Sequence, residues 1–223
     1  MAAYDWCWKR NNVSAPYVNS SGCNCLNNGK FMRVSGLTAL VLCLCLTGCS
    51  AALVPSTSKP RQKIEQAYEL ISAGRAIPAE KLALEAVDMY LKESNFIGAG
   101  NAETVLGVLY ASSAYHAAEA HYRELGTFDP TSDKSKQSFR KAVDLYKKGG
   151  EYWGAANALI GIGDAFSKQG DDTNACLSYR EALQTYLDPN AVFTGTAFTW
   201  NPKYPSYQAM LEAIIQNTCK ATT

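Results

Sequence analysis

The feature that most constrains the fold is an internal duplication. Residues 86–111 and 142–167 align without a gap at a constant offset of 56 residues, and ten of the 26 aligned positions are identical. Apolar residues recur at helical spacing from Arg61 onward, and no alternating strand pattern precedes the C-terminal loop. In a helical repeat, each unit buries its exposed face only against the next. We therefore predict an all-α repeat domain over residues 61–223.

The second copy resembles a tetratricopeptide repeat, a family of helical hairpins that stack into an α-α superhelix. The matching positions run through the first helix, the turn and the second helix: Leu159, Ile162, Gly163, Phe166, Gly170, Ala175, Tyr179 and Ala182. The first copy matches at Leu106, Gly107 and Tyr110. However, Glu119 stands where the family has a small Ala, and the offset of 56 residues exceeds the family's period of about 34. We interpret the copies as degenerate repeats with lengthened helices or linkers.

Local signals place some of the helices. Residues 61–73 and 79–92 are predicted helices, separated by Gly74 and Pro78. The apolar surface of the second of these is expected to comprise Leu82, Leu84, Ala86, Val87 and Tyr90. A closing helix over 206–219 is predicted to cap the last hairpin, as terminal repeats require.

A second segment predicts the location of the protein. Residues 32–48 begin with a cation at Arg33, continue as a short apolar run and end before Cys49, which is the pattern of an export signal. Leu46-Thr47-Gly48-Cys49 resembles the lipobox of bacterial lipoproteins. The resemblance implies that 32–48 is a lipoprotein signal peptide, cleaved before Cys49, and that the Cys49 thiol carries a diacylglycerol. The alternative is a permanent membrane helix, but the apolar run is shorter than the ~20 residues that a spanning helix needs.

The flanking segments complete the predicted organisation. Residues 1–31 lack helical or strand periodicity, so we expect them to be a non-native upstream extension, with Met32 as the start. A genuine N-terminal extension is the rival interpretation. Residues 49–60 are expected to form the lipidated cysteine and a tether to the folded domain. In the enterobacterial version of the lipoprotein family, a residue other than Asp at the position of Ser50 implies transfer to the outer membrane, with the domain facing the periplasm.

The resemblance to tetratricopeptide repeats also supplies candidate binding residues. Asn101 and Asn157 are matched positions of the two copies, and in the family this position lines the concave groove that holds peptides. The resemblance extends the candidate peptide-binding set to Thr104, Asp164 and Lys168. The groove lacks the Lys and Asn pattern of the family's carboxylate clamp, which disfavours a C-terminal carboxylate as ligand. The other interpretation is that the two asparagines only pack helices together.

Two C-terminal features leave alternatives open. Cys176 and Cys219 are a candidate disulfide, since the predicted export would place them in an oxidising compartment. Either could instead be a buried free thiol. The aromatic segment 190–207 is either a binding surface or a loop that folds back onto the cap.

Chemistry-bearing motifs are scarce. His116 and His121 are five residues apart, which does not put them on one helix face, so we predict no metal site. We find no phosphate-binding glycine loop and no nucleophile elbow, and we predict no enzymatic activity and no cofactor. From Ser50 onward there are 17 Lys and Arg against 19 Asp and Glu, which does not favour nucleic acid binding. A basic run is interpreted as a solvated helix face or a site for an anionic partner: Lys134, Lys136, Arg140, Lys141, Lys147 and Lys148.

These features together predict an outer-membrane-anchored lipoprotein whose repeat domain is a periplasmic scaffold. Its partners would be other envelope proteins, bound through the repeat groove during assembly of a secretion, pilus or outer-membrane machine. The alternative is an adaptor or regulator of cell-wall hydrolases, or an enzyme with an unrecognised site. The sequence leaves the oligomeric state open.

Overall fold

The computed structural model describes residues 57–191 and 203–219. The helices are α3 (Pro60–Ser72), α4 (Ala76–Lys92), α5 (Phe96–Tyr110), α6 (Ser113–Ala117), α7 (Glu119–Glu124), α8 (Asp133–Lys148), α9 (Tyr152–Lys168), α10 (Asp172–Tyr186) and α11 (Tyr207–Cys219). No strand occurs in the two described ranges, and the all-α prediction is confirmed. The predictions for the upstream extension, the signal peptide, Cys49, most of the tether and residues 192–202 of the aromatic segment lie outside these ranges.

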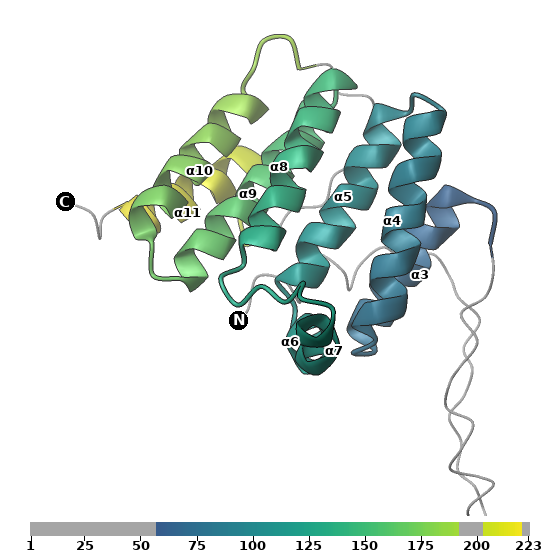
Figure 1. The fold of residues 1–223 in the computed structure, drawn as a ribbon. Coiled ribbons are helices and arrows are strands. Elements are labelled where there is room, and N and C mark those ends of the chain that lie inside the picture. The colour runs from purple at the N-terminus through teal and green to yellow at the C-terminus, as the bar shows by residue number, and fades with distance from the viewer. Residues whose placement is uncertain (1–56, 192–202, 220–223) are drawn as a thin grey trace, which may run out of the picture. The chain divides into compact units, whose positions relative to one another are not determined.

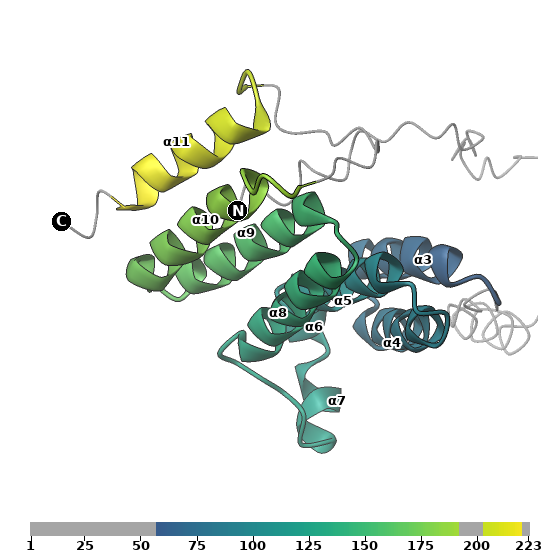
Figure 2. The ribbon, with the colours of Figure 1, turned by 90° about the horizontal axis from the view of Figure 1, so that it is seen from above.

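The helices pair into successive hairpins. Helix α3 packs on α4, α5 on α8, and α9 on α10, and each hairpin packs on the next through α4 with α5 and α8 with α9 (Figures 1 and 2). The first helices α3, α5 and α9 also touch one another in order, whereas α4 and α8 each pack between two first helices. Helix α11 lies against α10 and closes the stack. The predicted tetratricopeptide-like superhelix with a C-terminal capping helix is confirmed.

An insertion explains the long offset between the two copies. Helices α3 and α5 begin 36 residues apart, at Pro60 and Phe96, whereas α5 and α9 begin 56 residues apart, at Phe96 and Tyr152. The extra residues form α6, α7 and their loops, which come between α5 and α8 in the sequence and lie at one end of this hairpin (Figure 1). The linker is therefore lengthened, as one of the two options predicted, and the paired helices keep an ordinary length.

The insertion also corrects the position assigned to Glu119. That residue begins α7 and does not lie on the second helix of the hairpin. The small residue of the repeat pattern is Ser135 on α8, which is fully buried and donates a hydrogen bond from Oγ to the carbonyl oxygen of Gly107 at 2.8 Å. Ser135 precedes Phe139 by four residues, as Ala175 precedes Tyr179.

Glycine on the first helix lets an aromatic ring of the second helix come close. A β-carbon on Gly107 would lie only 2.7 Å from Cδ1 of Phe139, and one on Gly163 would collide with the ring of Tyr179. Real β-carbons essentially never come this near, so a larger residue at either position would force the aromatic ring or its helix to move. The same small-and-aromatic pair therefore sets the distance between helices in two hairpins.

Two details of α4 differ from the prediction. The helix begins at Ala76, so Pro78 lies inside its first turn, where a missing N–H leaves no helical hydrogen bond unmade. The chain reverses before it at Gly74, whose φ of 74° is readily adopted by glycine. Leu84 was expected to pack inside, but its side chain points outward and is 50% exposed.

We expect Gly163→Ala to lower the free energy of unfolding by about 1–2 kcal/mol. The steric clash with Tyr179 destabilises the fold by more than the higher helix propensity of alanine stabilises it. Urea denaturation followed by circular dichroism measures the change. Ser167→Ala, an exposed position on the same helix, is the control and should stay within about 0.5 kcal/mol of the wild type. A variant at position 163 as stable as this control would contradict the close contact.

Candidate functional site

The predicted groove residues lie on two neighbouring first helices. Asn101 and Thr104 are on α5, whereas Asn157, Asp164 and Lys168 are on α9. The first helices α3, α5 and α9 touch one another in order and form what is called here the inner layer of the stack. The two sets of residues therefore lie on the same layer. Whether this layer binds a peptide stays a prediction, but the internal contacts of each residue show what else it does.

Asn101 contacts the second helix of its own hairpin. The buried Tyr146 donates its hydroxyl proton to Oδ1 of Asn101 at 2.7 Å, and the same hydroxyl lies 3.2 Å from Oγ1 of Thr104. Burial raises the pKa of Tyr146, so the phenol is neutral and can donate over the physiological pH range. The side chain of Asn101 is nevertheless exposed, so it combines a helix-packing contact with access to solvent.

Asn157 makes the matching contact with a different helix. Its Oδ1 accepts a hydrogen bond from the hydroxyl of Tyr207 at 2.9 Å, and Tyr207 is the buried first residue of α11. The ring of Tyr207 stacks on Trp153 with centroids 5.8 Å apart and meets Tyr186 at 4.8 Å. In the last hairpin, the capping helix therefore covers part of the surface beside Asn157. At Tyr207, the aromatic segment folds back onto the stack.

The other two candidates on α9 also have partners within the domain. Asp164 accepts a hydrogen bond from the hydroxyl of Tyr179 at 2.7 Å, and burial together with this carboxylate raises the pKa of Tyr179. Nζ of Lys168 lies 3.5 Å from the carbonyl oxygen of Ala111, at the end of α5. Both contacts hold α9 in place, and the sequence pattern alone did not predict them.

An open groove lies at the junction of α8 and α9. It encloses about 410 Å³ and is lined by Asp133, Lys136, Gln137, Arg140, Ile162 and Phe166. Nζ of Lys136 lies 4.4 Å from the ring centroid of Phe166, and Arg140 bonds Glu181 of α10 at 3.2 Å. The apolar floor and charged rim could accept an apolar side chain of a protein partner. Only the basic run in the sequence pointed to this place.

The basic run is not one uniform solvated face. Lys134 and Lys136 lie largely against aromatic rings, with side chains 27% and 16% exposed. The remaining members are exposed, as the solvated-face interpretation predicted: Arg140, Lys141, Lys147 and Lys148.

The insertion and the last residue of α5 form an aromatic cage around Lys134. Its Nζ lies 4.3 Å from the ring centroid of Tyr110, 5.4 Å from that of Tyr115 and 5.3 Å from that of Tyr122. Glu80 of α4 accepts a hydrogen bond from the hydroxyl of Tyr110 at 2.6 Å and lies 3.8 Å from Nζ of Lys134. Cation–π and ionic attraction thus tie α8 and the insertion to α4 and α5. The aromatic residues around 110–128 were the only sequence signal, and their role was missed.

The histidines belong to this aromatic region. His116 on α6 packs against Tyr115 and Phe128, and His121 lies on α7 next to Tyr122. Across residues 57–191 and 203–219, no group of three His, Cys, Asp or Glu side chains could hold a metal ion. No helix in these ranges is long and apolar enough to cross a membrane.

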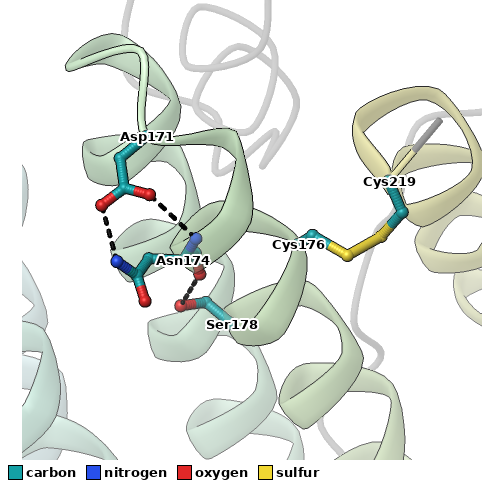
Figure 3. Close-up of a disulfide and its surroundings, with 5 residues drawn as sticks. All are labelled: Asp171, Asn174, Cys176, Ser178 and Cys219. Atoms are coloured by element: carbon teal, nitrogen blue, oxygen red, sulfur yellow. Dashed lines mark hydrogen bonds between the residues drawn. A yellow bond between two sulfur atoms is a disulfide. The ribbon is translucent and has the colours of Figure 1, made fainter. Parts of the chain in front are cut away.

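A disulfide fastens the cap. The structure joins Cys176 on α10 to Cys219, the last residue of α11, with Cα atoms 5.3 Å apart (Figure 3). Just before Cys176 along α10, Asp171 caps the helix by accepting a hydrogen bond from the backbone N–H of Asn174 at 3.0 Å (Figure 3). The pairing offered by the sequence is the one that the structure contains.

Glu103 is a buried carboxylate in the interface between α5 and α8. It is 6% exposed, and Nζ of Lys141 lies 3.9 Å from its Oε1, whereas Oε2 has no hydrogen-bond partner among the described residues. Burial raises its pKa, while Lys141 and Ser138 act in the opposite direction. The ionised form is therefore less favourable in the folded domain than in the unfolded chain.

We expect Glu103→Gln to stabilise the domain increasingly as the pH rises above the ordinary carboxyl pKa of 4.5. Because the folded-state pKa is raised, the contribution of Glu103 to stability is fully present below pH 4.5 and is lost as the pH rises through the folded-state pKa, whereas Gln has no such dependence. Thermal unfolding at a series of pH values measures the difference, expected to reach on the order of 1 kcal/mol at neutral pH. A difference that is constant or shrinks with rising pH would contradict this account.

We expect peptide mapping without reduction to recover one linked peptide pair containing Cys176 and Cys219. Removing the bond with Cys176→Ala should destabilise the domain by about 2–4 kcal/mol, because the bond closes a loop of 43 residues. Ser178→Ala on the same helix, tested alongside, loses only a local hydrogen bond to Asn174 and should cost about 1 kcal/mol. Free thiols at both positions in the untreated protein would end the prediction.

The comparisons with known proteins agree with the helical architecture. The family model described as "SNAP: Soluble NSF attachment protein, SNAP" matches residues 50–213, which is most of the chain. No curated protein and no solved structure matches the chain. Because the family model spans well over half of the residues, this chain belongs to the soluble NSF attachment protein family.

Proposed function

We propose that this protein is an outer-membrane-anchored lipoprotein whose repeat domain is a periplasmic scaffold for the assembly of an envelope machine. The observation that carries the proposal is the order of segments along the chain. A lipobox-like Leu46-Thr47-Gly48-Cys49 is followed by a short Pro-containing tether, and the stack of hairpins begins at Pro60. A lipid on Cys49 would hold the stack beside a membrane surface.

The fold supports the scaffold part of the proposal. Helical repeats of this family present extended surfaces for protein–protein interaction. The family is described as one of attachment proteins, and attachment to another protein is the property that a scaffold requires. Two surfaces are available for it: the exposed part of the inner layer at Asn101 and the open groove between α8 and α9.

The disulfide supports the periplasmic part of the proposal. Disulfides such as Cys176–Cys219 persist in oxidising compartments, among them the bacterial periplasm, and are rare in the cytosol. A domain carried by an export signal to the periplasm would form this bond there. The same domain in a reducing compartment would lose the covalent attachment of its cap.

We expect Cys49→Ser to abolish lipid attachment and to release the protein from the membrane fraction with its helical domain intact. The serine hydroxyl cannot replace the thiol that receives the lipid. Mass spectrometry of the native polypeptide and fractionation of the envelope measure the two effects. Thr47→Ser, a small substitution within the same motif, serves as control and should remain acylated. An unacylated N-terminus ahead of residue 49 in the wild-type protein would contradict the anchor.

The scaffold itself is tested by recovery of partners from detergent-solubilised envelopes. Stoichiometric co-purification of machine subunits, lost when the inner layer is altered by Asn101→Arg, would support it. Co-purification of cell-wall hydrolases, or turnover of wall fragments, would instead support the regulator or enzyme alternative. Circular dichroism checks that the Asn101→Arg variant keeps the helical spectrum of the wild type.

A further inference from the structure

The outward face of α4 carries a regular stripe of aliphatic side chains. Ile77, Leu84 and Leu91 follow one another at intervals of seven residues and are 42%, 50% and 44% exposed. Seven residues are nearly two helical turns, so the three side chains form one stripe about 21 Å long with a slow drift around the helix. The row occupies one position per heptad, with Lys81 and Asp88 beside it, so it is a narrow apolar surface with a charged flank on which another helix could pack.

The duplicated repeat shows that the hairpin does not need this stripe. The offset of 56 residues maps the three positions onto charged residues of α8: Asp133, Arg140 and Lys147. In α10, the position equivalent to Leu84 is also an arginine, since Arg180 follows Tyr179 as Arg140 follows Phe139. Two of the three second helices thus fold with Arg where α4 has Leu84. The aliphatic stripe is therefore free to serve an intermolecular contact.

The outward faces of two copies of α4 are complementary to each other in both their apolar stripe and their charges. Ile77 and Leu91 lie seven residues before and after Leu84. The exposed Lys81 and Asp88 lie on one flank of the stripe, three residues before Leu84 and four residues after it. When two such helices pack antiparallel about Leu84, each Lys81 faces Asp88 of the other helix. We propose that the outward face of α4 binds a second copy of this chain in this antiparallel arrangement, as a two-fold symmetric dimer.

The cost of forming the two intermolecular pairs is small. Asp88 now bonds Lys92 at 2.5 Å within α4, but the two side chains are 63% and 73% exposed. Such exposed pairs contribute little and exchange readily for another cation. A parallel pairing would leave the two charges on one flank without this reciprocal contact, so the charge pattern selects the antiparallel orientation.

The size of the contact predicts a weak dimer. Three aliphatic side chains on a single helix provide less than the ~800 Å² per partner of a standard stable interface. We expect an affinity in the micromolar range or weaker, which still allows capture by cross-linking. The inference does not use the groove residues or Cys49, so it stands or falls separately from the proposed function.

The test is photo-cross-linking in cells that express the full chain. With p-benzoylphenylalanine at position 84, we expect an adduct of twice the mass, linked to residues 77–91 of a second copy. The matched control carries the same group at position 140, the duplicate of position 84 on α8, and should give no such adduct. An adduct at position 84 only with another protein, or no adduct at all, would overturn the proposal.

A charge exchange tests the antiparallel orientation. Lys81→Asp and Asp88→Lys should each reduce the yield of the adduct about tenfold, because each replaces two attractive pairs with two repulsive ones. The double variant Lys81→Asp with Asp88→Lys restores both pairs and should restore the yield. Circular dichroism checks that each variant is folded. A folded double variant with the low yield of the single variants would overturn the arrangement.

Discussion

Close approach of helices over glycine is the constraint on which the structure depends. Tyr146 shows this most fully, because its ring fills the space left by the missing side chains of both Gly100 and Gly154. One residue on α8 thereby sets the distance to α5 within its own hairpin and to α9 in the next. Its hydroxyl then finds Asn101, so the same ring positions a polar group of the candidate site. The contacts that pack the helices therefore also position the polar residues of the inner layer.

The helical hairpins could be predicted because their determinants are local. In the last hairpin, the small and aromatic residues of both helices lie within one continuous stretch, and the turn at Gly170 has the positive φ that glycine favours. The second hairpin was harder, since its two helices are separated by an insertion. An alignment counts residues and cannot tell an inserted helix from a paired one, which is why Glu119 was given a position that belongs to Ser135.

The candidate site was predictable in its location and not in its contacts. The matched Asn101 and Asn157 do fall on the first helices, as the repeat pattern indicated. Their phenol partners lie 45 and 50 residues further along the chain, and one of them is on the cap. Such pairings depend on the register between whole helices, which residue spacing does not contain. The outward direction of Leu84 was missed for a similar reason, because an apolar residue at helical spacing signals burial equally well in a helix or between two molecules.

The bond between Cys176 and Cys219 makes the two ends of the stack differ in how firmly the terminal helix is held. A linear array of repeats tends to fray from its ends, where a terminal unit has only one neighbour. Here the carboxyl end is sealed: even if the contacts of α11 break, the helix stays tethered beside α10 and docks again at high effective concentration. At the amino end of the described residues, α3 is held to α4 by noncovalent contacts such as the ion pair of Lys63 with Glu85 at 2.6 Å. Within the described residues, we therefore expect α3 to separate from the stack under tension more readily than the bonded α11.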